Sequence, residues 1–516
     1  AVRRLEPLPE SEIGEVRLFS ALPENLTYPN VTPRLMAEAQ RNIGGCNMTT
    51  EELRNSLLAS PKNGYTRLTD AQRDEMEGYA QRYMAFMSEC KTEREATAWA
   101  VREAEKLGYK PFAPGMETKP GDKIYYNNRN KSIALAVVGT KSLGEGANIC
   151  AAHVDSPRLD IKPNPLYEDS EISYLKTHYY GGIKKYQWTT IPLALHGVVY
   201  RADGAVVTVT IGEDEGDPVF VVTDLLPHLA EEQYKRPATK LIKGEELNIL
   251  VGSRPFRDDK ISEKVKLNLL NILFEKYGIV EKDFLSAELE CVPAFKAKDV
   301  GFDRSMIGGY GQDDRVCAYT ALRAILDIKK PQKTAICLLV DKEEVGSMGA
   351  TGMQSRRFEN VLAKICSMMA ENYNDIVLRD ALTNSTCLSA DVGAALDPNY
   401  PEVSDKRNCP IFGGGIALTK YTGSRGKGGA SDASAELVAK IRRIFNDSGV
   451  KWQIGELGKV DCGGGGTIAQ FVANLDMDVI DAGVALLSMH SPYELSSKLD
   501  VFMTYKGYRE FYKNNF

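Results

Sequence analysis

The sequence predicts an α/β fold, and three observations carry this prediction. Short apolar runs typical of buried strands recur along the chain, as in NICAAH and TAICLLV. From about Gly301 onward these runs alternate with patterns of helical period. Between 166 and 299 the pattern changes to short alternating strands split by turn signals such as Ala202-Asp203-Gly204. We therefore expect an α/β domain interrupted by a mostly β insertion.

The elements can be justified in chain order. Residues 1–75 are interpreted as an N-terminal extension without an assigned role, because prolines at positions 7, 9, 23, 29 and 33 break up its short helical patches. Residues 70–107 have the amphipathic pattern of one or two helices. KIYYNNRNKSIALAVVG predicts two strands joined by a turn at 127–130, and a buried strand, NICAAHVDS, follows. The expected α/β domain therefore comprises residues 76–165 and 300–516, with residues 166–299 as the inserted β domain.

The second part of the α/β domain continues the alternation. Helices are predicted at DDRVCAYTALRAILDI, near residues 357–373 and at SDASAELVAKIRRIF. Strands are predicted at TAICLLVD, CLSAD and DVIDAGVALLSMH. Two glycine-rich stretches, GSRGKGGASD and DCGGGGTIAQ, lack the spacing of a phosphate-binding loop.

Composition limits the class of protein. A chain of 516 residues with 43% hydrophobic content can bury a large core. Its net charge of −6 gives no support for nucleic-acid binding, and no run of about 20 apolar residues predicts a membrane span. The ten cysteines are spread singly and include no CxxC pair, which is typical of reduced, buried thiols. The N-terminus lacks the apolar core of a signal peptide, so we expect a cytoplasmic protein.

Hard metal ligands stand at the ends of several predicted strands. Strand ends of an α/β sheet form a shared crevice, so residues distant in sequence can converge there. Two histidines and several carboxylates without cysteine suit two divalent ions such as zinc, cobalt or manganese, which is a hydrolase design. The residues are His153, Asp155, Asp313, Glu343, Glu344, Asp391 and His490.

Most of these positions also have a structural interpretation. Asp313 with Asp314 could cap the following helix, Asp391 could form an Asx-turn, and His490 could be a core histidine. Glu343 and Glu344 are the exception, because adjacent acids after a buried strand repel each other and need cations to offset their desolvation. Their side chains point to opposite sides of an extended segment, so one can bind metal while the other faces a water.

Six segments in this order resemble the aspartyl aminopeptidase family of dinuclear zinc aminopeptidases, which includes the vacuolar aminopeptidase I type. They are HVDSPRLDIK, GQDDR, DKEEVGS, ADVGAALDPNY, LTKYTGSRGKGGASDA and SMHSPYEL, and the resemblance runs from about residue 75 to the C-terminus. It implies a three-layer α/β/α sandwich with a mixed sheet, an inserted β dimerisation domain, and assembly into a homo-oligomer of twelve subunits.

The resemblance also implies roles for individual residues. One metal would be held by His153, Asp313 and Asp391. The other would be held by Asp313, Glu344 and His490, so that Asp313 bridges both. Glu343 would be the general base and Asp155 would orient His153. Two substrate-binding residues are implied, namely Lys420 and, from a neighbouring subunit, His196.

The sequence thus predicts a dinuclear aminopeptidase that removes the first residue of a peptide, with Asp or Glu as the possible preference. The chain departs from the family at Gly393, Ala394 and Ala395, where histidines are common, which leaves a neutral or broad specificity open. Two other classes remain as alternatives. A dinuclear amidohydrolase or deacetylase could use the same ligands, and a non-catalytic assembly protein could keep the same fold. Comparing a peptide with a free amino terminus and its N-acetylated form distinguishes an aminopeptidase from an amidohydrolase or deacetylase. Measuring metal content and substrate turnover distinguishes an enzyme from a non-catalytic assembly protein.

Overall fold

The computed structural model describes residues 49–59, 62–258, 260–370 and 372–515. The chain divides into two units, residues 1–61 and 62–516. In the first unit, helix α2 (Thr50–Leu57) begins at a capping box in which Thr49 and Glu52 satisfy each other's backbone N–H. Residues 1–48 of the predicted extension lie outside the described residues. Everything below concerns the second unit.

A nine-stranded mixed sheet organises the second unit. Four of its central strands, β14, β4, β15 and β21, run parallel to one another. Their side chains are buried on both faces, as expected for parallel strands. The strand order is β1 (Lys110–Pro111), β2 (Lys123–Asn128), β3 (Ser132–Val137), β14 (Thr334–Val340), β4 (Ala147–His153), β15 (Thr386–Ser389), β21 (Asp478–Gly483), β17 (Ile416–Thr419), β19 (Trp452–Ile454).

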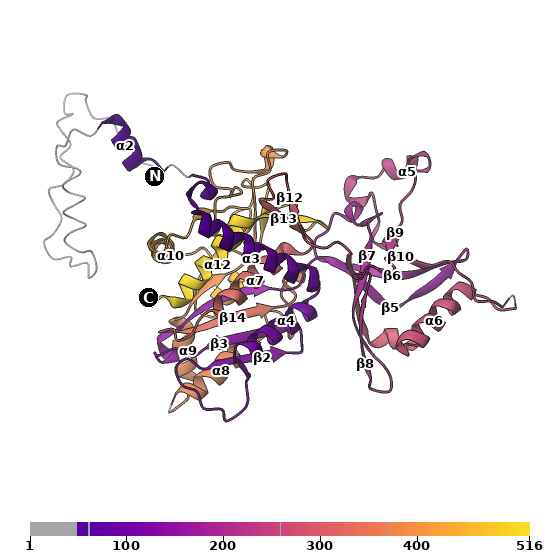
Figure 1. Ribbon diagram of the computed structural model, residues 1–516, viewed down its shortest axis with the longest axis horizontal. Coiled ribbons are helices and arrows are strands. Elements are labelled where there is room, and N and C mark those ends of the chain that lie inside the picture. The colour runs from indigo at the N-terminus through magenta and orange to yellow at the C-terminus, as the bar shows by residue number, and fades with distance from the viewer. Residues whose placement is uncertain (1–48, 60–61, 259, 371, 516) are drawn as a thin grey trace, which may run out of the picture. The chain divides into compact units, whose positions relative to one another are not determined.

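Helices cover both faces of this sheet, and β14 shows how the two cores are divided (Figure 1). Alternate residues of a strand point to opposite faces. Ala335, Cys337 and Leu339 accordingly join one core and Ile336, Leu338 and Val340 the other. The first core contains α3 (Asp70–Glu89), α4 (Glu93–Lys106), α7 (Gln312–Leu326), α10 (Ala435–Asp447) and α12 (Lys498–Lys513), and the second contains α8 (Arg357–Met369), α9 (Asp375–Thr383) and α11 (Ala469–Ala473).

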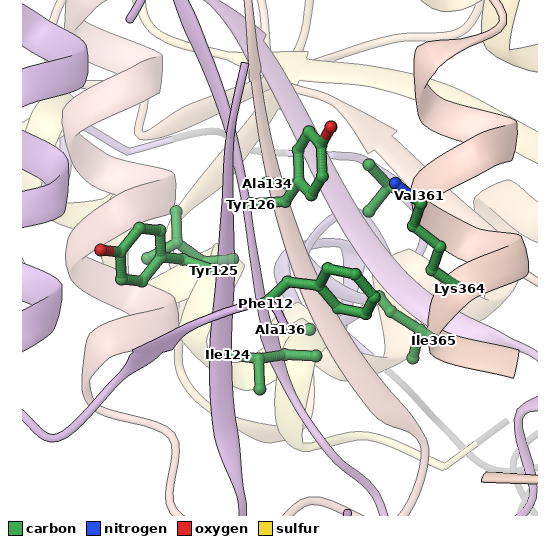
Figure 2. Close-up of a pocket in the computed structure, with 10 residues that line it drawn as sticks. Phe112, Ile124, Tyr125, Tyr126, Ala134, Ala136, Val361, Lys364 and Ile365 are labelled. Atoms are coloured by element: carbon green, nitrogen blue, oxygen red, sulfur yellow. The ribbon is translucent and has the colours of Figure 1, made fainter. Parts of the chain in front are cut away.

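A small hollow lies where α8 crosses β2 and β3 (Figure 2). Its walls are apolar, and the ammonium of Lys364 lies 5.3 Å from the ring centre of Phe112 and 4.8 Å from that of Tyr126. The space inside is about 10 Å³, which is enough for one water molecule at most. This hollow is therefore a packing feature of the second core and leaves no room for a substrate.

The insertion forms a separate seven-stranded antiparallel sheet, called here the β module. Helix α6 (Lys264–Tyr277) packs on it, and the short α5 (Glu231–Tyr234) lies at its margin (Figure 1). The predicted boundaries, 165/166 and 299/300, fall inside strands. The strand order is β8 (Val206–Ile211), β7 (Leu193–Tyr200), β11 (Ala287–Pro293), β5 (Arg158–Asp169), β6 (Ile172–Tyr180), β10 (Ile249–Gly252), β9 (Val221–Val222).

Two smaller sheets complete the second unit. Strands β18 (Gly423–Ser424) and β20 (Gly464–Gly465) form a two-stranded pair between glycine-rich loops. The five-stranded sheet is joined in the order β12 (Lys298–Val300), β13 (Met306–Gly309), β23 (Glu494–Ser497), β22 (Ala485–Leu487), β16 (Gly393–Ala394). Its strands β22 and β23 flank the loop that carries His490.

The predicted α/β class is confirmed, and the helices predicted at 70–107, 357–373 and 431–445 correspond to α3 with α4, α8 and α10. The nine cysteines within the described residues are all free, and seven of them are buried. Among the described residues, no helix is both long and apolar enough to cross a membrane.

A candidate metal centre at the carboxyl edge of the sheet

Three of the predicted ligand segments meet because their strands are parallel and in register. His153 is the last residue of β4 and pairs with Val340, the last residue of β14. Ser389 of β15 pairs with Ala151, so Asp391 follows at the same edge. Glu343 and Glu344 begin the short 3₁₀ helix η8 (Glu343–Val345), just after β14. The carboxyl ends of parallel strands thus place side chains from three distant segments together.

Asp313 connects this edge to a fourth segment. It lies at the start of α7, and each of its carboxylate oxygens faces a different histidine. The Asp313 Oδ1 atom is 3.2 Å from His153 Nε2, and the Oδ2 atom is 3.1 Å from His490 Nε2. The side chain is only 5% exposed. A carboxylate placed between two imidazole nitrogens in this way is suited to bridging two cations.

The remaining predicted ligands lie on either side of this bridge. Asp391 Oδ1 is 3.9 Å from His153 Nε2, and Glu344 Oε1 is 3.5 Å from His490 Nε2. The buried Oε1 atom of Glu344 has no hydrogen-bond partner among the residues that the structure describes. Ligand atoms of His153, Asp313 and Glu344 lie within 4.8 Å of one another, as do those of His153, Asp314 and Asp391. Asp314, which was expected only as a helix cap, accepts a hydrogen bond from the His153 backbone N–H at 3.3 Å instead.

The charges of this cluster favour bound cations. Within the described part of the chain, the ion pairs of Asp313, Glu344 and Asp391 involve only the two histidines. Burial raises the pKa of Glu344 and of Asp391 well above the usual range. Burial opposes protonation of His490, but the hydrogen bond to Asp313 and the negative charges of Asp313 and Glu344 together outweigh it and raise the His490 pKa to about 10. An anionic, buried set of oxygen and nitrogen donors fits divalent metal ions.

Glu343 has the environment of a proton acceptor. Burial, opposed by His153, raises the pKa of its carboxyl group to about 7. Asp155 fixes the main chain at this point, because its Oδ1 accepts the Glu343 N–H and its Oδ2 the Glu344 N–H, both at 3.1 Å. The His153 ring lies close to Asp155 as well, with Nδ1 3.0 Å from the Asp155 carbonyl oxygen and 3.4 Å from Oδ1. Asp155 therefore contacts both the histidine and the glutamate pair.

Sequence reasoning missed four residues that contact this cluster. Tyr180, at the end of β6, donates its hydroxyl hydrogen to Asp155 Oδ2 at 2.8 Å. A Cβ at Gly181 would lie 3.1 Å from Glu344 Oε2, so the main chain there passes directly against this ligand. The Gly182 carbonyl accepts from His490 Nδ1 at 2.8 Å, which leaves Nε2 free to bind metal. Glu494 accepts the backbone N–H groups of Asp313 and His490.

These residues could not be found from local pattern, because three of them belong to the β module. The motif THYYGG contains no acid, and its one histidine, His178, is exposed, so nothing in it distinguishes Tyr180, Gly181 and Gly182 from residues of an ordinary turn. Glu494 lies within the quoted segment SMHSPYEL, and its position four residues after His490 was the only signal available.

His196 lies elsewhere in its own chain. It is 1% exposed, on β7, with Nδ1 2.7 Å from Glu95 Oε1 and Nε2 3.0 Å from Glu213 Oε1. Burial lowers the pKa of His196, but these two hydrogen bonds outweigh it and raise the pKa above the usual value. Both ring nitrogens are thus engaged within the subunit.

Lys420 directly follows β17, and this strand is antiparallel to β21. Thr419 pairs with Asp481 of β21, and Asp481 pairs with Ser389 of β15. Because β17 runs in the opposite direction to these two strands, the chain at Lys420 leads away from the edge of the sheet that carries Asp391. The Lys420 ammonium is half-exposed and forms an ion pair with Asp432 at 2.6 Å. The described contacts do not bring Lys420 to the metal-ligand cluster.

Comparison with known proteins identifies the family. The sequence model of the aminopeptidase I zinc metalloprotease family, M18, matches residues 86–512. A probable M18 family aminopeptidase 1 from Clostridium acetobutylicum is 54% identical over 464 residues, covering 89% of this chain and 100% of the relative. A crystal structure of aminopeptidase I from the same organism has a TM-score of 0.83, with 54% identity and coverage of 89% and 100%.

Two further solved structures extend the likeness. The crystal structure of an M18 family aminopeptidase from Thermotoga maritima has a TM-score of 0.85 and 46% identity, covering 89% of this chain and 100% of the other. The yeast mApe1 dodecamer of Saccharomyces cerevisiae has a TM-score of 0.70 and 21% identity, covering 85% and 97%, and shares the fold. The expected resemblance is confirmed, and the chain belongs to the M18 family of zinc metalloproteases and is an aminopeptidase.

Proposed function

We propose that this aminopeptidase works with two divalent ions, preferentially zinc, held by His153, Asp313, Glu344, Asp391 and His490. The observation that carries the proposal is the position of Asp313, whose two oxygens each face a different histidine. His153, Asp313 and Asp391 would hold one ion, and Asp313, Glu344 and His490 the other. Cobalt or manganese could replace zinc, since the donors are nitrogen and oxygen only.

The proposed reaction removes the first residue of a peptide by hydrolysis. When bound, the ions polarise the scissile carbonyl and lower the pKa of the attacking water. Glu343 would accept the proton of that water and later donate it to the nitrogen of the leaving peptide. A pKa of about 7 for Glu343 supports both transfers near neutral pH, because a general acid and base works best close to the ambient pH. Asp155 would keep Glu343 in place through the main chain.

Metal analysis and a substrate panel test this proposal. Elemental analysis of fully active protein is expected to give about two ions per chain. An aminoacyl substrate panel with zinc, cobalt and manganese would define the preferred residue, and a peptide with a free amino group is expected to be cleaved while its N-acetylated form is not. One ion or fewer in fully active enzyme would contradict the dinuclear centre, and cleavage of the acetylated form would favour an amidohydrolase.

The preference for an acidic first residue is a further part of the proposal, and it depends on Lys420. Its ammonium is already paired with Asp432, so an acidic substrate would have to displace that carboxylate. Lys420→Met is expected to lower kcat/KM for an aspartyl substrate more than for a leucyl one. Equal losses on both would remove Lys420 from substrate recognition and favour neutral or broad specificity.

We also propose that the protein is a cytoplasmic homo-oligomer of twelve subunits. The free, mostly buried cysteines support a reducing compartment. Helix α6 of the β module exposes Leu267, Ile272 and Phe274, each 40% or more, which supports an interface there. A fold neighbour, yeast mApe1, is described as a dodecamer. Light scattering or mass photometry would measure the number of subunits.

Sharing of active sites between subunits has its own test. If His196 serves a neighbour's site, mixed oligomers of Glu343→Gln and His196→Ala chains should regain part of the activity. The contacts of His196 with Glu95 and Glu213 would have to break for this to happen. No rescue in verified mixed oligomers would leave His196 with a structural role in its own subunit.

A further inference from the structure

Glu494 is a buried carboxylate at the metal centre that is not among the proposed ligands. It is the first residue of β23 and only 1% exposed. Its Oε1 accepts the backbone N–H of His490 at 2.7 Å, and its Oε2 accepts the backbone N–H of Asp313 at 3.1 Å. Both oxygens therefore contact the main chain of proposed ligands, Asp313 and His490, which are far apart in the sequence.

The carboxylate of Glu494 forms no ion pair with a lysine or arginine among the described residues. Among the ion pairs of the described residues, none involves Glu494, although other buried carboxylates such as Glu93 and Glu290 are paired with Arg158. Burying an unpaired carboxylate is costly, and two hydrogen bonds from backbone N–H groups recover only part of that cost. Divalent ions on the far side of Asp313 and His490 would supply the missing positive charge.

The contacts also explain how two separate segments are kept at the right spacing. Asp313 begins a helix, whereas His490 lies in a loop between two strands and has a positive φ of 63°. A single rigid carboxylate that accepts from both backbones fixes the distance between the two ligands. The Gln312 side chain, which donates to the Glu494 carbonyl at 2.7 Å, adds a third connection between these segments.

We propose that Glu494 is a positioning residue of the metal centre, which raises the affinity for the ion held by Asp313, Glu344 and His490. This inference rests on the dinuclear centre proposed above. Glu494 acts through the main chain of two ligands and through its charge, without contacting metal or substrate. Residues behind the ligands typically change metal affinity by about 10- to 100-fold when they are replaced.

Asp500 offers a matched control within the same chain. It is also fully buried, and its two oxygens accept the backbone N–H groups of Gly415 at 2.6 Å and Gly413 at 2.9 Å. Those glycines hold no proposed ligand. Both substitutions change a buried carboxylate that accepts two backbone N–H groups. Glu494→Gln does so at the metal centre, and Asp500→Asn does so away from it.

The experiment measures metal binding directly, with the whole protein. Wild type, Glu494→Gln, Glu494→Asp and Asp500→Asn are stripped, then titrated with cobalt by visible absorption and with zinc against a competing chelator. We expect Glu494→Gln to lower the binding affinity for one of the two ions by about 10- to 100-fold, and Glu494→Asp to lower the affinity for the same ion less. Asp500→Asn should leave both affinities unchanged while lowering the thermal midpoint of stripped and loaded protein alike.

The outcomes separate this inference from the proposed function. Unchanged affinity in both Glu494 variants, or an equal loss in Asp500→Asn, would overturn the role of Glu494 while leaving the dinuclear centre intact. Wild type that binds only one cobalt ion would overturn the dinuclear centre itself. If Glu494→Gln does not fold, the Glu494→Asp titration decides, because an affinity equal to that of wild type would overturn the proposal.

Discussion

Two histidine clusters in this chain are similar in composition and differ in how their charges are balanced. At the sheet edge, His153 and His490 share Asp313, and further carboxylates surround them without a lysine or arginine partner among the described residues. At the base of the β module, His196 lies between Glu95 and Glu213. There Lys91 pairs with Glu213 at 2.6 Å, and backbone N–H groups at Lys91 and Thr92 satisfy Glu95.

The comparison shows what distinguishes a metal site from an ion network. Histidine beside two carboxylates occurs in both places, so that pattern alone does not predict metal. A protonated His196 with Lys91 balances Glu95 and Glu213 inside the protein, whereas the sheet edge has more carboxylates than its histidines can neutralise. The unbalanced cluster gains stability from divalent ions, and the balanced one holds the β module against the α3–α4 corner.

Removal of metal should separate the two clusters most strongly. Chelation is expected to abolish peptide hydrolysis and to lower the thermal midpoint, because the carboxylates at the sheet edge lose their cations. An ion present at 1,000 times its dissociation constant contributes about 4 kcal/mol to stability. Adding zinc back should restore both properties, and His196→Gln should respond to chelation as wild type does. Hydrolysis that persists in fully stripped protein would contradict the comparison.

Replacing Glu343 should be the next largest effect. Glu343→Gln is expected to lower kcat by roughly 10²-fold or more, because an amide cannot accept the proton. Its metal content, measured by elemental analysis, should stay at the wild-type level. Glu344→Gln is the matched neighbour, and it should lose metal affinity instead. Loss of metal in Glu343→Gln would show that the two glutamates have been assigned in the wrong order.

A smaller effect is expected where the β module touches the metal centre. Tyr180→Phe removes the hydroxyl that donates to Asp155, and the Arg158 guanidinium, 3.9 Å from the centre of the Tyr180 ring, would still pack on the phenyl group. We expect kcat to fall about tenfold with little change in KM or metal content. Tyr179→Phe, on the same strand with an exposed ring, is the control. Equal kinetics for the two variants would exclude a role for Tyr180 in placing Glu343.

The smallest effect concerns the pH dependence of the balanced cluster. Hydrogen bonds with Glu213 and Glu95, working against burial, raise the pKa of His196 in the folded protein. A raised pKa contributes stability that is complete below the unfolded value of about 6.5 and is lost as pH rises through the folded pKa. The thermal midpoint of wild type should therefore exceed that of His196→Gln most clearly near pH 6, and the difference should shrink as the pH rises. A difference that grew with rising pH would have the wrong sign.

The local pattern of the sequence was sufficient for the elements that carry the site. Apolar runs before His153, Glu343 and Asp391 predicted the three buried strands, of which β4 ends at His153 and β14 and β15 end two or three residues before the predicted ligand. The alternation of such strands with helices predicted the α/β class. Ordered motifs gave the family, and the ligand types gave the kind of metal.

Only the tertiary structure decided which of these residues meet and what holds them. Strand register brings His153 beside Asp391, and the packing of α7 turns Asp313 between two histidines, neither of which a linear pattern encodes. The same folding placed His196 in a closed ion network and Lys420 against Asp432. Contacts made through main-chain atoms, such as the Gly182 carbonyl that accepts from His490, leave no signature in residue type, since any sequence supplies N–H and C=O groups. Their function follows from position alone, and position is fixed by long-range packing.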